Sequence, residues 1–204
     1  MTAEKKSTLT IMSENQLTNH IKQYIDIDEN DLDFLLPMLD FNKVKKNKFI
    51  INSGSQCNDL YFISEGCLKK YYINTEGKER VFTFATEMQW IGDMNSLRKQ
   101  EKTIFNISAL EDTELIVISK TNIEKLINHI PKFERYFRQI SYDLIYKLER
   151  RINQCLSCSA EERYGDFIQD FENLEQRISQ KEIASYIGIT PEFLSVLRSK
   201  KIKT

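Results

Sequence analysis

The sequence is poor in residues that interrupt or cross-link a chain. It has three prolines, six glycines and two histidines among its 204 residues, and no apolar run approaches the ~20 residues of a membrane helix. Its N-terminus has no hydrophobic signal core, so we expect a cytoplasmic protein. The cysteines are too few for a disulfide framework in a chain of this length. They are Cys57, Cys67, Cys155 and Cys158.

An excess of charge of one sign is also absent, because the formal net charge is −1. The charge is unevenly placed, however. Residues 176–204 carry six lysines and arginines against Glu182 and Glu192, which leaves −5 for the rest of the chain. A basic end on an acidic body favours a local nucleic-acid contact over general polyanion binding. The alternative is a solvated helix terminus with favourable basic residues.

Short apolar runs separated by turn residues fill the middle of the chain. We predict an irregular start over residues 1–13 and interrupted helix over 14–39. At least six short strands follow between Phe49 and Ser119, with a hairpin turn at Asn74–Gly77. This spacing predicts a small antiparallel barrel or sandwich.

One long helix is predicted over residues 132–156, after a short helix capped by Ser119. Its apolar residues recur every three or four positions and form a continuous seam with charged flanks. Half of this seam can cover the β domain, and the other half can meet the same helix of a second chain. Packing within one chain is the alternative. The predicted dimer interface is Phe137, Ile140, Leu144, Leu148 and Ile152.

A helix, a tight turn and a second helix are predicted between Ser179 and Lys201, after a helix over 160–174. Ser179 with Glu182 has the spacing of a capping box, and Gly188 suits a left-handed helix end. Thr190 and Pro191 suit the start of the second helix. This pattern is typical of a DNA-binding helix-turn-helix. An ordinary helical hairpin is the alternative.

Residues 59–66, 74–80 and 90–93 resemble the strand, the hairpin and the start of the phosphate-binding cassette of the Crp/Fnr regulators. The order of these motifs and the helix-turn-helix strengthen the resemblance. It implies an α+β fold: an antiparallel jelly roll with flanking helices, a long dimerisation helix and a C-terminal helix-turn-helix domain. The implied domains are a cyclic-nucleotide-binding-like effector domain (14–131), the dimerisation helix (132–156) and the DNA-binding domain (159–204).

The resemblance also implies an effector pocket formed by Gly92, Asp93, Met94, Lys102 and Thr103. Relatives that bind cyclic nucleotides have an arginine where this chain has Thr103, and arginine neutralises the cyclic phosphate. We therefore expect an unidentified small-molecule effector other than cyclic AMP. A cassette that serves only for packing is the alternative.

No metal or other cofactor is expected. Cys155 and Cys158 form a lone CxxC pair, which is too little for an iron–sulfur cluster. Free cysteine is the simpler interpretation, and a redox role for the pair stays open.

The resemblance places DNA contacts in and before the second helix of the motif. Val196 stands where relatives usually have an arginine that reads guanine, and valine offers only apolar contact, for example with a thymine methyl group. Basic residues after it suit phosphates. The predicted DNA-binding residues are Ser179, Gln180, Thr190, Glu192, Phe193, Ser195, Val196, Arg198, Lys200 and Lys201.

We expect a homodimeric transcription regulator that binds double-stranded DNA at an inverted-repeat operator. The C-terminal β wing of many relatives is absent, either because this is a short form or because the chain has been cut. RNA polymerase is a further partner that the resemblance implies, and no membrane partner is expected. The rival hypothesis is a ligand-binding or scaffold protein that has lost specific DNA binding. An enzyme is not expected, because no Ser-His-Asp set, HExxH or P-loop motif occurs.

Overall fold

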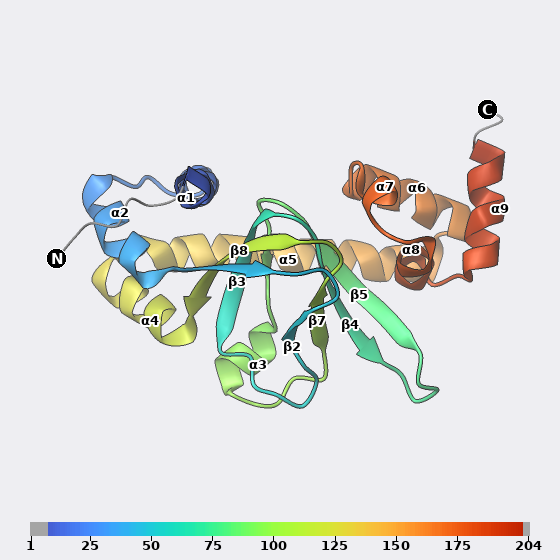
Figure 1. Ribbon diagram of the computed structural model, residues 1–204, viewed down its shortest axis with the longest axis horizontal. Coiled ribbons are helices and arrows are strands. Elements are labelled where there is room, and N and C mark those ends of the chain that lie inside the picture. Colours follow the sequence, from blue (N-terminus) through green and yellow to red (C-terminus); the bar gives the residue numbers. More distant parts are fainter. Residues whose placement is uncertain (1–7, 202–204) are drawn as a thin grey trace. The chain divides into compact units, whose positions relative to one another are not determined.

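The computed structural model describes residues 8–201, with side chains from residue 11 to residue 199 (Figure 1). The helices are α1 (Thr8–Lys22), α2 (Glu29–Leu35), the 3₁₀ helix η1 (Leu36–Met38), α3 (Met94–Lys99), α4 (Lys120–His129), α5 (Lys132–Ser157), α6 (Ala160–Asp170), α7 (Leu174–Arg177), α8 (Gln180–Ile187) and α9 (Pro191–Lys201). The strands are β1 (Asp40–Val44), β2 (Phe49–Ile51), β3 (Asp59–Glu65), β4 (Leu68–Ile73), β5 (Glu79–Ala85), β6 (Trp90–Ile91), β7 (Asn106–Ala109) and β8 (Thr113–Ser119).

The chain forms two compact units. The first unit contains Met1–Lys69 and Phe84–Ser141, and the second contains Lys70–Thr83 and Tyr142–Thr204. The β4–β5 hairpin therefore groups with the C-terminal helices, and α5 contributes to both units. The domain boundaries drawn from the sequence (14–131, 132–156 and 159–204) stay a prediction.

The α+β class and the antiparallel sheets predicted from the sequence are confirmed. One four-stranded sheet has the order β1-β8-β3-β6, and the other has the order β2-β7-β4-β5. In the first sheet, β8 lies between β1 and β3 and pairs antiparallel with both.

Both faces of the first sheet are covered, which explains the unbroken apolar run in β3. Leu60 and Phe62 belong to a core cluster that includes residues of the helices. Tyr61 and Ile63, which point to the opposite face, join a second cluster with residues of β2 and β7. In a strand that is buried on both faces, successive residues are all apolar instead of alternating between apolar and polar.

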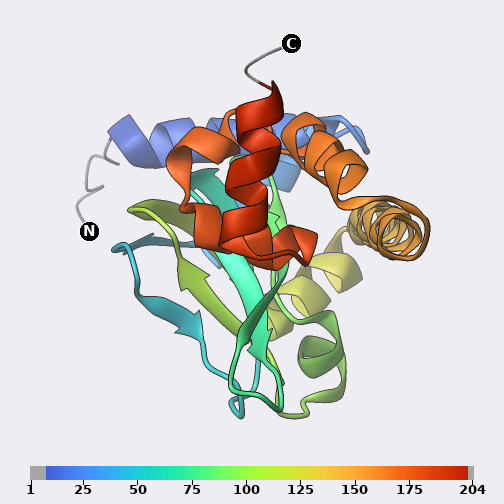
Figure 2. The same cartoon turned by 90° about the vertical axis from the view of Figure 1, so that its right-hand side faces the viewer.

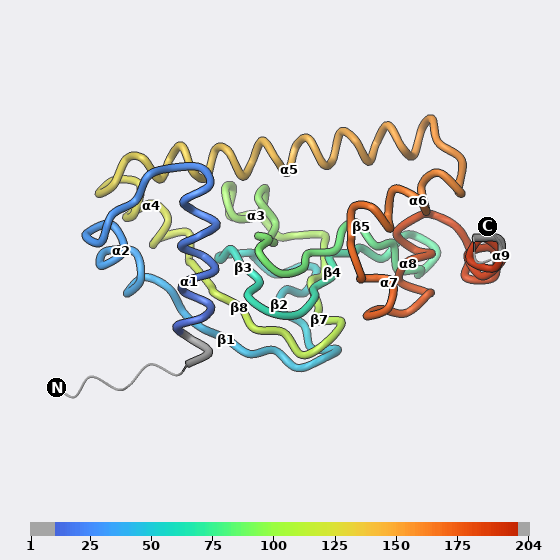
Figure 3. Tube along the Cα trace, turned by 90° about the horizontal axis from the view of Figure 1, so that it is seen from above, coloured from blue at the N-terminus to red at the C-terminus, as the bar shows by residue number. Residues whose placement is uncertain are grey.

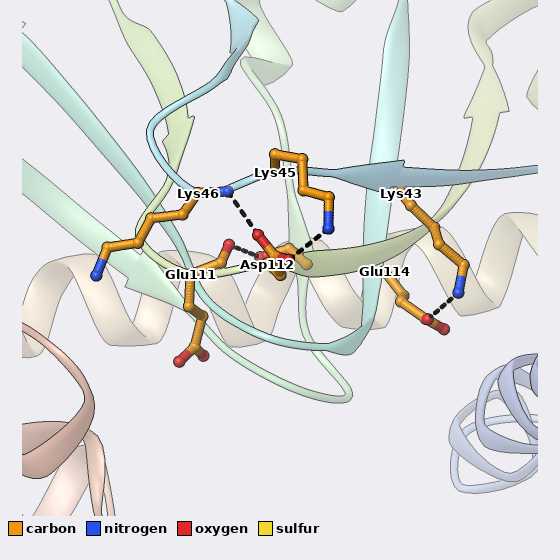
Figure 4. Close-up of polar contacts among 7 residues, drawn as sticks. Lys43, Lys45, Lys46, Glu111, Asp112 and Glu114 are labelled. Atoms are coloured by element: carbon orange, nitrogen blue, oxygen red, sulfur yellow. Dashed lines mark hydrogen bonds and ion pairs between the residues drawn. The ribbon is translucent and has the colours of Figure 1, made fainter.

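Three lysines fix the register of β1 on β8 (Figure 4). Lys43 lies opposite Glu114 and its Nζ is 2.6 Å from the carboxylate, while Lys45 is 2.7 Å from Asp112. The backbone N–H of Lys46 also donates to Asp112, at 3.0 Å. The hydrogen bond from Lys45 lowers the pKa of the Asp112 carboxyl group. These exposed pairs favour one register of an edge strand more than they add to stability.

The helices α1 and α4 and the start of α5 cover the first sheet. Helix α1 contacts β3, and α4 contacts β8. Figure 3 shows α1, α2 and α4 near one another in the first unit. Helix α1 begins at Thr8, so the irregular start predicted for residues 1–13 is wrong over its second half; residues 1–7 lie outside the described residues. Phe133 and Tyr136 of α5 are both 1 % exposed.

The Tyr136 hydroxyl joins three parts of the first unit. It accepts a hydrogen bond from Trp90 Nε1 at 2.7 Å, and it lies 2.9 Å from His20 Nδ1. The indole N–H is only a donor, so the phenolic oxygen accepts from it, and the donor in the contact with His20 is set by the histidine tautomer. Burial raises the pKa of the Tyr136 phenol, so it stays neutral. This network ties α1, β6 and α5 together.

The sequence missed two elements and placed the end of a third too late. Strand β1 was not predicted because its polar residues, exposed in the structure, hide the β period. Helix α3 was missed because six residues give no helical period, although Asp93 caps its N-terminus. The helix predicted over 160–174 ends at Asp170, and the chain turns at Asn173 with φ of 63° before α7.

Replacing Tyr136 by phenylalanine removes both hydrogen bonds of the hydroxyl while it keeps the ring. We expect the free energy of unfolding to fall by about 1–3 kcal/mol, measured by urea unfolding. Tyr142→Phe on the exposed part of α5 is the matched control and is expected to change stability by less than about 0.5 kcal/mol. Equal losses in the two variants would contradict the network.

Candidate nucleic-acid interface and effector pocket

Helices α8 and α9 form the predicted helix-turn-helix pair in the second unit. Ser179 Oγ accepts from the N–H of Glu182 at 3.3 Å and so caps α8. Gly188 ends α8 with φ of 84°, in the left-handed region, and its N–H donates to Ala184 O at 2.9 Å. Thr190 then caps α9 by accepting from the N–H of Phe193 at 3.2 Å. Ser179 and Thr190 thus cap the two helices and Gly188 ends α8, as the sequence indicated.

The buried sides of α8 and α9 meet each other and α6. Ile183 and Ala184 of α8 and Leu194 of α9 are at most 1 % exposed. Arg163 of α6 donates from Nε to the carbonyl of Ile187, which satisfies a carbonyl at the end of α8. Helix α9 therefore packs on a small core of its own unit.

The predicted base-reading residues are all exposed on this pair of helices, whose ribbons Figure 2 shows toward the viewer in orange and red. Exposed side chains are those of Ser179, Gln180, Thr190, Glu192, Phe193, Ser195 and Val196. Hydrogen bonds to its own backbone N–H and to Thr190 lower the pKa of the Glu192 carboxyl group, so Glu192 is a charged acceptor at the start of α9.

The residues predicted to contact phosphates differ in their exposure and in their partners within the protein. Arg198 is half-buried, and its Nε lies 2.9 Å from Glu175 Oε1. The Tyr164 hydroxyl donates to the same carboxylate oxygen at 2.5 Å. Arg198 thus already serves to hold α9 against α7. Lys200 and Lys201 belong to α9, but their side chains lie outside the described residues.

The β4–β5 hairpin contacts α8 directly, which no sequence signal indicated. Ser185 Oγ accepts from the N–H of Val81 at 3.1 Å and donates to Glu79 O at 3.0 Å. Arg151 of α5 donates to the carbonyls of Val81 and Tyr186, at 3.2 and 2.7 Å. Its guanidinium also lies 3.6 Å from the centre of the Tyr186 ring, a cation–π distance.

Two residues of the predicted effector pocket, Asp93 and Thr103, are buried and hydrogen-bonded to each other. Asp93 is 7 % exposed and Thr103 is 3 % exposed. One oxygen of Asp93 caps α3 by accepting from the N–H of Asn95 at 3.2 Å, and the other accepts from the Thr103 hydroxyl at 2.5 Å. Both carboxylate oxygens therefore have partners within the protein.

The neighbouring groups close the cassette further. Cys57 Sγ accepts from the N–H of Asp93 at 3.4 Å, and Ser96 Oγ donates to Glu101 O. A Cβ at Gly92 would lie 2.8 Å from Leu60 Cδ2, so the backbone packs directly on β3. Of the other predicted pocket residues, Lys102 and Met94 are exposed.

An open cavity of about 340 Å³ lies beside the cassette, between α3 and α4. Met94 is the one predicted pocket residue that lines it. The other lining residues are Asn95, Leu97, Arg98, Lys120, Ile123 and Glu124. Lys120 donates to the carbonyl of Arg98 at 3.3 Å, so this cation is partly engaged.

Neither a metal-binding cluster nor a membrane helix is found in the described part of the chain. Residues 8–201 contain no group of three or more His, Cys, Asp or Glu side chains arranged to hold a metal ion. None of their helices combines the length and the apolar character needed to span a membrane.

The middle of the chain matches a known domain. Residues 41–129 match the cyclic nucleotide-binding domain, which covers the strands and the cassette. The chain is 24% identical over 186 residues to the anaerobic regulatory protein of Haemophilus influenzae, across 84% of this chain and 70% of that protein. The domain match covers the β-sheet part of the chain, and the similarity to this regulatory protein covers most of the chain.

Solved structures share the fold. FixK2 from Bradyrhizobium japonicum superposes with a TM-score of 0.71 at 16% identity, across 79% of this chain and 83% of that one. A Crp/Fnr family regulator from Eubacterium rectale gives 0.67 at 20%, across 87% and 85%. Because these structures are less than 25% identical to the chain, they show its fold, and the domain match covers residues 41–129. The Haemophilus influenzae relative is named as a regulatory protein, and the Eubacterium rectale structure as a transcriptional regulator of the Crp/Fnr family.

Replacing Thr103 by valine keeps the volume of the side chain but removes its hydroxyl. The variant loses the bond to Asp93 and the bond accepted from the N–H of Phe105. We expect the free energy of unfolding to fall by about 1–3 kcal/mol in urea unfolding. Thr121→Val, on the exposed side of α4, is the control with almost no expected effect. An unchanged midpoint for Thr103→Val would show that the cassette does not depend on this bond.

Proposed function

We propose that the chain is a homodimeric transcription regulator that binds an inverted-repeat operator through α9 of each subunit. The observation that carries this proposal is the outward face of α9. Its exposed residues lie over buried Leu194 and Leu197, and α8 holds the helix from behind. A helix seated in this way fits the major groove of DNA.

The second half of α5 supports a dimer. In the chain alone, apolar side chains of this half are exposed, and Ile152 and Leu156 reach 60 % and 81 %. The other exposed apolar side chains there are Tyr142, Leu144, Ile145 and Tyr146. A run of this kind on a helix is typical of an interface that a second copy covers. Of the predicted interface, Leu148 is half-buried, while Phe137 and Ile140 also pack on the core of the first unit.

The effector of this regulator is proposed to be a molecule other than cyclic AMP. The Asp93 carboxylate of the predicted pocket accepts a hydrogen bond from the Thr103 hydroxyl. Lys102 brings an ammonium group and no planar fork for a phosphate. RNA polymerase as a partner rests on the resemblance.

A selection from random duplexes tests the proposed function. We expect the recovered sites to be inverted repeats whose half-sites lie roughly 34 Å apart, one helical turn, as in other dimers of this motif. Affinity should fall steeply with salt, because basic side chains contact phosphates. Recovery of no enriched sequence, with equal binding to all duplexes, would instead favour the rival ligand-binding or scaffold protein.

Charges placed on α5 should separate the dimer. We expect Leu144→Glu combined with Ile152→Glu to give monomers in analytical ultracentrifugation, because the seam would bring like charges together in an apolar contact. Both side chains are exposed, so the variant should keep its fold, which circular dichroism can check. Ile104→Glu, at an equally exposed apolar position of the first unit, is the control that should stay dimeric. If the double variant stays dimeric, the interface does not lie on this part of α5.

Cyclic AMP is expected to bind weakly or not at all in titration calorimetry with the full chain. Binding would have to break the bond between Thr103 and Asp93 and would leave the phosphate without an arginine fork. Tight binding with one nucleotide per chain would contradict this expectation.

A further inference from the structure

The outward face of α9 is unusually apolar for a helix that enters a DNA groove. Phe193 and Val196 are 47 % and 49 % exposed, and they lie three residues apart, which places them on one face of the helix. Leu194 and Leu197, on the other face, fill the core of the unit. The two exposed side chains therefore do not serve the packing of their own unit.

The described side chains of α9 offer little that reads guanine. A guanine is best recognised by an arginine or lysine that donates to O6 and N7. Arg198 is the one basic side chain of α9 between residues 191 and 199, and its Nε donates to Glu175. Glu192 is a charged acceptor, which suits the amino group of cytosine rather than guanine.

We propose that Phe193 and Val196 read the 5-methyl groups of thymines, so that T·A base pairs at the centre of each half-site specify the operator. The inference rests on the proposed function, because it assigns the base class that α9 reads. Thymine is the base that presents an apolar group in the major groove, and phenylalanine or a branched methyl side chain is its natural contact.

The spacing of the two side chains fits neighbouring base pairs. Residues three apart are separated by roughly 4.5 Å along a helix, and successive bases of one strand by roughly 3.4 Å. The two side chains can thus contact thymines of adjacent or next-adjacent pairs. Contact with one methyl group removes about as much apolar surface from water as one CH₂ group, which corresponds to roughly fourfold in affinity.

The test replaces thymine by deoxyuridine in the duplex that the selection recovers. This change removes the methyl group and keeps every hydrogen-bonding group of the base. We expect a loss of roughly fourfold per contacted thymine in a fluorescence-anisotropy titration with the full chain at one salt concentration. Substitution outside the half-sites should have no effect.

Variants of the protein assign the contact. Val196→Ala should weaken binding to the thymine duplex, and should make binding almost insensitive to deoxyuridine at one position. Phe193→Ala should do the same at a neighbouring position. Lys181→Gln is the control: it removes an exposed charge from α8, so it should weaken both duplexes equally and keep their ratio.

The possible outcomes separate the inference from the proposed function. Failure to recover any preferred duplex would remove the proposed function itself. Specific binding that does not change with deoxyuridine anywhere in the half-site would overturn the inference alone. A deoxyuridine effect that persists in both alanine variants would overturn it as well, because another side chain would then read the methyl groups. Variants with unchanged affinity for every duplex would also overturn it, because the two side chains would then make no contact with DNA.

Discussion

The packing of the second unit depends on the hydrogen bonds and the ring contact made by the guanidinium group of Arg151. This group joins α5 to two segments that are distant in the sequence: β5, through the carbonyl of Val81, and α8, through the carbonyl and the ring of Tyr186. Ser185 repeats the link between the hairpin and α8. Because Gly188 leads straight from α8 into α9, the direction of the recognition helix relative to the second half of α5 follows from these contacts. In a dimer built on α5, they would also set the distance between the two recognition helices.

The two candidate sites differ in how their polar groups are used. In the cassette, Asp93 has partners on both carboxylate oxygens, so a ligand would have to compete with bonds that already exist. On α9, Phe193 and Val196 are exposed and the capping groups lie at its start. The cassette is therefore organised as part of the fold, whereas the helix face is organised toward a partner. This contrast supports DNA recognition more strongly than it supports the sensing of any particular ligand.

The helix-turn-helix could be predicted from the sequence because its signals are local. Ser179, Gly188 and Thr190 act on atoms within five residues of themselves, and each does in the structure what its position indicated. The closure of the cassette could be predicted only in part: the missing arginine was visible, but the bond between Thr103 and Asp93 was not. The contacts of Ser185 span more than a hundred residues and depend on a hairpin whose placement no local pattern encodes. Helix α3 was too short for a period to appear.

The burial of Cys57 gives the cassette a built-in chemical reporter. Its thiol is 1 % exposed, accepts from the N–H of Asp93 and donates to the carbonyl of Asp59, whereas Cys155 lies exposed near the end of α5. An alkylating reagent therefore reaches Cys57 only during a local opening. The ratio of the labelling rates of Cys57 in the folded and in the unfolded chain measures how often the cassette opens, on the scale on which local unfolding equilibria are expressed. A compound that enters or tightens the cassette would change this ratio, so it can be found without knowing its identity in advance.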